Sequence, residues 1–199
     1  MTLLGLDFDN TLVRYDNLFH QLAIEKGLIE GSLPAEKIAI RNYLRSQGQD
    51  EQFTLLQGEV YGLRILEAEP AEGMLKAISE LHQHGIPMVL VSHKTRTPYK
   101  GPAYDLHHAA WSWLEKQGFF SPNGLNWKHN QVFFESTKQD KVDRIEALEC
   151  THYVDDLPEI LKMLPNRTKP ILYDPGKVHH HKTFIQLQKW SDAINIFLN

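Results

Sequence analysis

Short apolar runs alternate with longer segments of helical periodicity along much of the chain. Apolar runs bounded by polar turns predict buried strands, and the helical segments between them predict crossover connections of a parallel sheet. The predicted strands are 3–6, 86–91, 131–134, 151–154 and 169–173. This alternation predicts an α/β fold with a doubly wound parallel sheet of Rossmann type.

The segment that follows the first predicted strand has a different character. Three helical patterns, 16–27, 34–48 and 50–66, follow one another with no strand signal between them. A run of about 55 residues is far longer than a crossover connection needs. We therefore predict a small helical cap, 15–69, inserted into a core domain made of 1–14 and 70–199.

Further helical patterns follow the later strands. Apolar residues recur at helical spacing in 71–84 and 102–117, and Val142, Ile145 and Leu148 mark a helix with Lys141 in its first turn. Proline at a first helical position favours another helix from Pro158. The sequence also predicts a strand at 169–173 followed by a closing amphipathic helix over 183–197.

Composition narrows the class of protein. The chain has 199 residues with 42% hydrophobic content, which suits one globular core carrying a modest insertion. A net charge of -4 without a Lys/Arg tract predicts no nucleic-acid partner.

Cys150 is the only cysteine, which excludes an internal disulfide and favours a buried packing role. No apolar run approaches 18 residues and no leader is evident, so we expect a soluble, cytoplasmic protein without a membrane partner. The run 179–181 of three histidines is interpreted as incidental.

Candidate chemistry begins at the end of the first strand, with Asp7 and Asp9. Ligands of open α/β sheets bind at this carboxyl end. Two carboxylates ~4 Å apart at an effective dielectric of ~20 repel by about 4 kcal/mol, so a cation is expected beside them. Oxygen ligands suit Mg²⁺. Acidic residues after a strand also form turns or helix caps, and this alternative stays open for the pair alone.

Polar groups recur at three later points. Ser92 ends the next strand, where a hydroxyl either binds a phosphate oxygen or caps a helix. Lys141 lies near a helix start, where the helix dipole disfavours a cation unless an anion is bound. Asp155 and Asp156 repeat the acid pair after another strand. Four carboxylates at one sheet edge are hard to explain structurally and are typical of a Mg²⁺ site.

The ordered set resembles the four motifs of the haloacid dehalogenase (HAD) superfamily. The matching residues are Asp7-Phe8-Asp9-Asn10-Thr11, Ser92, Lys141 and Asp155-Asp156. They span most of the chain, and the helical insertion between the first two motifs resembles that superfamily's first-type cap. The resemblance implies a HAD-like core domain and a hydrolase, with substrate left open.

The resemblance also implies roles by position. Asp7 matches the nucleophile that forms an aspartyl phosphate, Asp9 matches the general acid and base, and Thr11 matches a residue that supports the loop. Dehalogenases of the superfamily lack an aspartate at the second position, so Asp9 points to phosphoryl transfer.

The remaining matches concern phosphate and metal. Ser92 and Lys141 match the pair that binds the phosphoryl oxygens, although Lys138, three residues before Lys141, is an alternative lysine. Asp155 and Asp156 match the acids that hold Mg²⁺ together with the Asp7 carboxylate and the Asp9 backbone carbonyl, with Asp156 favoured as the direct ligand.

The sequence therefore predicts a Mg²⁺-dependent phosphatase acting on a small phosphorylated substrate such as a sugar phosphate or nucleotide. A phosphomutase, a phosphoprotein phosphatase and an inactive HAD-fold binding protein remain alternatives, and the oligomeric state is left open. Candidates for specificity are Arg14 to Asn17, Arg41, Tyr43 and the loop Lys94 to Lys100, where Arg96 and Lys100 would suit a second anionic group.

Overall fold

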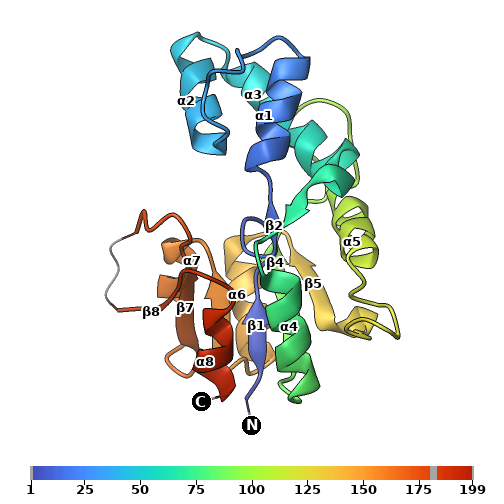
Figure 1. The fold of residues 1–199 in the computed structure, drawn as a ribbon, viewed down its shortest axis with the longest axis vertical. Helices are drawn as coiled ribbons and strands as arrows, with labels where there is room; N and C mark the ends of the chain where they lie inside the picture. The colour runs from blue at the N-terminus through green and yellow to red at the C-terminus, as the bar shows by residue number, and fades with distance from the viewer. Residues whose placement is uncertain (1, 180–182, 199) are drawn as a thin grey trace. The chain divides into compact units, whose positions relative to one another are not determined.

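The computed structural model describes residues 2–179 and 183–198. The chain forms two compact units (Figure 1). We call them the α/β unit, which consists of Met1–Val13, Pro70–Lys94 and Gln117–Asn199, and the helical unit, which consists of Arg14–Glu69 and Thr95–Lys116.

The α/β unit is built on a six-stranded parallel sheet. Its strands, in spatial order, are β5 (Val132–Glu135), β4 (Met88–His93), β1 (Leu4–Leu6), β6 (His152–Asp155), β7 (Lys169–Tyr173) and β8 (Ile185–Leu187). The central strand β1 is buried throughout, and Gly5 is in register with Val89 of β4 and Tyr153 of β6. This order brings the carboxyl ends of β4, β1 and β6 together at one edge.

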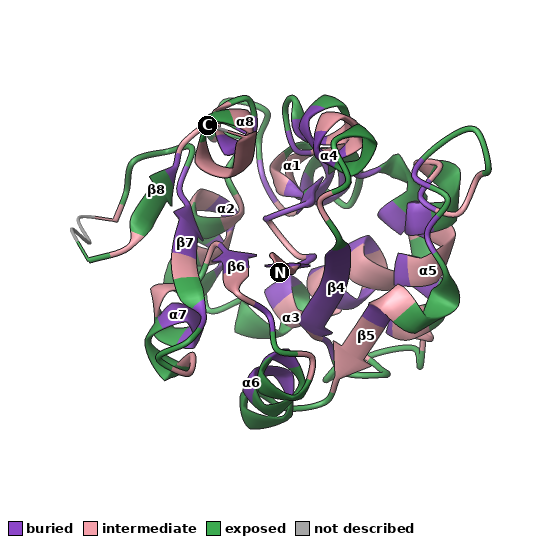
Figure 2. Ribbon diagram, turned by 90° about the horizontal axis from the view of Figure 1, so that it is seen from below, coloured by how far each residue is buried: buried purple, intermediate pink, exposed green. Residues whose placement is uncertain are grey.

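Helices cover both faces of this sheet. Figure 2 shows α4 (Met74–Gln83) and α8 (Asp192–Leu198) over one face, and α6 (Lys138–Ala147) and α7 (Pro158–Met163) over the other. A short 3₁₀ turn, η3 (His129–Gln131), precedes β5. The doubly wound parallel α/β fold predicted from the sequence is confirmed.

The helical unit contains α1 (Asp16–Glu25), α2 (Lys37–Ser46), α3 (Asp50–Gly58), a π-helical turn η1 (Glu59–Leu63), a 3₁₀ turn η2 (Ile65–Glu67) and α5 (Leu106–Lys116). Aromatic side chains join these elements. The rings of Phe19 and Phe53 stack with centroids 5.7 Å apart, and Tyr61 packs edge-on against Phe19 at 5.7 Å. Such pairs add to the free energy gained by burying apolar surface.

The position of α5 differs from the division predicted from the sequence, which placed 95–116 in the core domain and only 15–69 in the cap. Trp113 of α5 is fully buried and donates its indole N–H to the Ala68 carbonyl oxygen at 2.9 Å. At Gly62 a Cβ would come within 2.6 Å of the Tyr104 side chain, so glycine permits this close approach. These contacts join α5 and the residues just before it to the segment from η1 to Ala68, within the helical unit.

Several boundaries also differ from the predictions. The predicted closing helix 183–197 is wrong, because the chain forms strand β8 and then the shorter helix α8. The helix predicted over 34–48 is α2, which begins at Lys37 and ends at Ser46. Two short strands, β2 (Val13–Arg14) and β3 (Glu69–Pro70), form a separate pair.

His180 and His181 of the histidine run lie outside the described residues. Within the part of the chain that the structure describes, no helix is both long and apolar enough to cross a lipid bilayer.

Candidate active site

The candidate site lies within the α/β unit and begins where β1 ends. Asp7 continues the ladder, since its backbone N–H donates to the Val154 carbonyl oxygen at 2.9 Å. A tight turn follows, in which the N–H groups of Leu12 and Val13 both donate to the Phe8 carbonyl oxygen at 3.0 and 3.2 Å. Asn10 takes a positive φ of 58°, a conformation that asparagine tolerates better than most residues. This turn lies between the buried strand β1 and the short strand β2.

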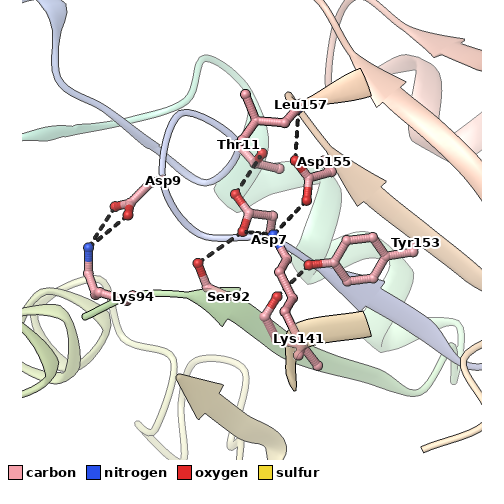
Figure 3. Close-up of polar contacts among 10 residues, drawn as sticks. Asp7, Asp9, Thr11, Ser92, Lys94, Lys141, Tyr153, Asp155 and Leu157 are labelled. Atoms are coloured by element: carbon pink, nitrogen blue, oxygen red, sulfur yellow. Dashed lines mark hydrogen bonds and ion pairs between the residues drawn. The ribbon is translucent and has the colours of Figure 1, made fainter. Parts of the chain in front are cut away.

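The carboxylate of Asp7 is the centre of the site (Figure 3). Its Oδ1 accepts hydrogen bonds from Ser92 Oγ at 2.9 Å and from Lys141 Nζ at 2.6 Å. Its Oδ2 accepts a longer bond from Thr11 Oγ1 at 3.4 Å. All four residues are buried, with at most 4% of each exposed. The fold thus joins residues from three distant parts of the sequence around one carboxylate.

Lys141 is the buried cation of this cluster. It lies in the first turn of α6, whose start is capped by Thr137, which accepts a hydrogen bond from the Asp140 backbone N–H at 3.0 Å. Its Nζ also donates to Asp155 Oδ2 at 2.6 Å and lies 5.5 Å from the centroid of the Tyr153 ring. Burial alone would favour the neutral amine, but the negative charges of Asp7 and Asp155 outweigh it and hold the pKa of Lys141 well above its usual value.

The two lysines that the sequence left open lie in different surroundings. Lys138 is exposed and donates to Glu159 Oε1 at 2.6 Å, whereas Lys141 contacts Asp7. Lys141 lies on the buried side of α6 with Val142 and Ile145, and its long side chain reaches Asp7 at the sheet edge.

Asp155 and Asp156 follow β6 and bring further negative charge to the site. Asp155 is fully buried, and its Oδ1 accepts the Leu157 backbone N–H at 2.8 Å. Burial raises the pKa of Asp155 to about 7, and the charge of Asp7 adds to this while Lys141 opposes it. Burial, with the charges of Asp155 and Asp7, raises the pKa of Asp156 well above its usual value. If all three carboxyl groups were ionised, they would carry more negative charge than Lys141 balances, which agrees with the direction of these pKa shifts.

This cluster has the chemistry of a cation site. Carboxylate oxygens of Asp7, Asp155 and Asp156 all lie within 4.8 Å of one another. A hard divalent cation with oxygen ligands would offset both the burial and the mutual repulsion that raise these pKa values. The donor atoms of these three residues are all carboxylate oxygens, so the residues fit Mg²⁺ better than a softer metal.

Asp9 has a different partner, Lys94, which the sequence identified only as part of a specificity loop. Lys94 Nζ donates to both oxygens of Asp9, at 2.9 and 2.8 Å (Figure 3). Lys94 is only 4% exposed, and its Nζ lies 5.3 Å from the centroid of the Phe8 ring. The available sequence signal was its place two residues after Ser92, at the sheet edge where Asp9 was also expected.

The other specificity candidates belong to the helical unit, in which Arg14 and Tyr43 are exposed and Arg41 is half-buried. Arg96 forms an exposed ion pair with Asp105, and Lys100 forms one with Glu51.

No protein-family model matches the chain, and no curated protein matches it in sequence. Solved structures do resemble it in fold. The HAD hydrolase YfnB of Bacillus subtilis, bound to magnesium, is 14% identical, with 100% of this chain and 99% of that chain covered and a TM-score of 0.55. A HAD family hydrolase of Deinococcus radiodurans R1 with bound phosphate and sodium is 13% identical, with 96% and 93% covered and a TM-score of 0.58. A protein described as a dehalogenase is 9% identical, with 100% and 98% covered and a TM-score of 0.58. At these identities the likeness concerns the fold, and the chain has the fold of the HAD hydrolases.

Proposed function

We propose that this protein is a Mg²⁺-dependent phosphatase of the HAD superfamily that hydrolyses a small phosphomonoester, of the sugar phosphate or nucleotide class. The observation that carries the proposal is a buried carboxylate, Asp7, held by Ser92 and Lys141 beside a second acid pair. The magnesium and the phosphate bound to two proteins of the same fold support it.

Asp7 is the nucleophile in this proposal. A carboxylate oxygen attacks phosphorus, the bond from phosphorus to the leaving oxygen breaks, and an aspartyl phosphate forms. In the proposal Ser92 and Lys141 bind the phosphoryl oxygens, and their hydrogen bonds to Asp7 support this role. The raised pKa of Lys141 keeps its ammonium charged, which suits stabilisation of negative charge in the transition state.

Asp9 moves the protons. It gives a proton to the leaving alcohol oxygen in the first step, and it takes one from the water that then attacks the aspartyl phosphate, which releases inorganic phosphate and restores Asp7. Displacement of a halide needs no proton donor, because halides are stable anions. The second aspartate therefore favours phosphate esters over haloacids, although one protein of this fold is a dehalogenase.

Mg²⁺ would be held by Asp7, Asp155 and Asp156, together with the backbone carbonyl of Asp9. When bound, the ion supplies positive charge that neutralises the carboxylates and the phosphoryl group. Asp155 also accepts from Lys141, so the ion and the lysine would act on the same carboxylates.

The test measures phosphate release from a panel of phosphorylated metabolites with Mg²⁺ and with a chelator. Turnover that requires Mg²⁺ and is lost in Asp7→Asn would support the proposal, and the order of substrates would define the class. Halide release from a 2-haloacid is measured in parallel. Halide release without phosphate release would overturn the proposal in favour of a dehalogenase.

A further inference from the structure

The buried ion pair between Lys94 and Asp9 is not explained by the four-motif pattern. Lys94 directly follows β4, and its backbone N–H donates to the Glu135 carbonyl oxygen of β5 at 2.9 Å. Its side chain is 3% exposed, whereas that of Asp9 is 26% exposed. A buried ammonium is costly unless it is paired, so the lysine requires this carboxylate more strongly than the carboxylate requires the lysine.

The lysine is the fixed member of the pair. Its backbone is tied into the sheet between β4 and β5, and its ammonium lies over the ring of Phe8. Phe8 is itself fully buried and packs edge-on against Phe134 of β5, with ring centroids 5.9 Å apart. The direction of the Asp9 side chain is therefore set from the end of β4 rather than by the turn that carries Asp9.

The two aspartates of the first motif, Asp7 and Asp9, each pair with a different lysine. Lys141 contacts Asp7 and Asp155, whereas Lys94 contacts Asp9 (Figure 3). The carboxylates that cluster as a cation site are those of Asp7, Asp155 and Asp156, without Asp9. Lys94 thus holds the second aspartate beside the cation cluster and not within it.

We propose that Lys94 is a positioning residue for Asp9. It keeps the Asp9 side chain in one place, where it is not drawn into the cluster of Asp7, Asp155 and Asp156. This inference rests on the proposed function for its catalytic meaning, since a group that transfers protons in two successive steps must keep its position through both. Misplacing a catalytic group by about 1 Å costs about 10²-fold in rate.

The variant Lys94→Met removes the charge and keeps a chain that can lie on the Phe8 ring. Because Asp9 is partly exposed, water can solvate its carboxylate when the lysine is lost, so we expect the variant to fold. Lys94→Gln carries the same expectation and replaces it if Lys94→Met does not fold. Lys162→Met, an exposed lysine of the same unit, is the matched control.

The first readout separates the two chemical steps with p-nitrophenyl phosphate. Its leaving group needs no proton, so the burst of p-nitrophenol reports attack by Asp7, and the steady-state rate reports hydrolysis of the aspartyl phosphate. For Lys94→Met we expect a burst rate within about threefold of wild type and a steady-state kcat about 10²-fold lower, with KM lowered by a similar factor so that kcat/KM stays within about threefold. Lys94→Arg, which keeps a cation, should recover at least about tenfold of that loss. A merely structural role would lower burst amplitude and steady-state rate together, and that result would overturn the proposal.

The second readout does not depend on activity. It compares crystal structures of wild type and Lys94→Met. We expect the Asp9 carboxylate to contact Lys94 in the wild type and to point in a different direction in the variant. An Asp9 carboxylate that stays in place without the lysine would overturn the proposal. Absence of phosphate release by the wild-type protein would instead contradict the proposed function, and the crystal structures would still decide the role of Lys94.

Discussion

The two units of this protein bury different kinds of side chain. The buried polar residues among those described are all in the α/β unit: Asp7, Thr11, Ser92, Lys94, Lys141, Asp155, Thr168 and Asp174. The described residues that are buried in the helical unit are apolar or aromatic side chains and one glycine. Burial of charge costs free energy and burial of apolar surface supplies it. The buried charged side chains at the sheet edge therefore lower the stability of the α/β unit, whereas the described residues of the helical unit include no such buried charges. Buried charges of this kind are expected where residues are selected for function rather than for stability.

The strongest test of this contrast is Asp7→Asn. If Asp7 is the nucleophile, phosphate release by the variant should be at least about 10⁴-fold slower than by the wild type. The melting temperature should move by only a few degrees, because Asp155 remains as a partner of Lys141. Asp143→Asn, on an exposed position of α6, is the control. Activity above about a thousandth of wild type would rule out Asp7 as the nucleophile.

Lys141→Met tests the cost of the buried charges directly. Removing the shared cation leaves the carboxylates of Asp7 and Asp155 buried without it, which should lower the free energy of unfolding by about 3–5 kcal/mol in urea titrations. Lys138→Met removes an exposed lysine of the same helix and should change it by less than about 0.5 kcal/mol. Equal effects of the two changes would contradict the contrast between buried and exposed charge.

In the helical unit the sensitive positions should be apolar. Leu56 is 1% exposed, and Leu56→Ala should cost about 2–5 kcal/mol through lost burial and a new cavity. The first protease cuts should then fall within 14–69 or 95–116. Leu63→Ala, at a leucine that is 60% exposed, serves as the control and should leave the cleavage pattern unchanged. Early cuts within the α/β unit would contradict an independent apolar core.

The raised pKa of Asp155 predicts how Mg²⁺ acts on stability. Its usual value is 3.8 and its folded value is about 7, so in metal-free protein the proton stabilises the fold below about pH 4 and this contribution is lost as pH rises to about 7. Mg²⁺ competes with that proton. At about 100 times its Kd, the ion should stabilise by about 2.7 kcal/mol at pH 8 and by less at pH 5. A thermal shift that is the same at both pH values would argue against Asp155 as part of the cation site.

The smallest expected effect concerns Cys150, which is 1% exposed. Burial raises the pKa of its thiol to about 11. At pH 8 only about one thiol in a thousand is then ionised, so reaction with a disulfide reagent should be slow in the native protein and rapid in urea. Because Cys150 is the single cysteine, the released chromophore reports this site alone. Rapid labelling of the native protein would show that this part of the α/β unit opens readily.

The positions of most strands, and the acidic residues that follow them, could be predicted from the sequence. A buried parallel strand needs a continuous apolar run, as in Leu4–Leu6, and the polar residues after such runs mark one edge of the sheet. The strand predicted over 169–173 is β7, with the same bounds. Strand β8 was missed because only Ile185 and Leu187 alternate there, which is too short a pattern to separate from a helix.

The partners of individual lysine side chains could not be predicted from the sequence in the same way. Lys94 and Lys100 lie in one polar stretch, yet one is buried against Asp9 and the other pairs with Glu51 at the surface. The difference depends on Phe8 and Asp9, which are more than 80 residues away in sequence. Membership of α5 in the helical unit likewise depends on contacts such as that of Trp113 with Ala68, which no local pattern encodes.

The absence of a side chain at Gly5 carries an evolutionary consequence. A Cβ there would come within 2.5 Å of the Tyr153 ring, the ring that lies beside the Lys141 ammonium. Any larger residue at position 5 must therefore displace the tyrosine and, through it, the lysine. Among homologues we expect positions 5 and 153 to vary together, with glycine wherever the neighbouring strand carries an aromatic residue and larger residues only where it does not.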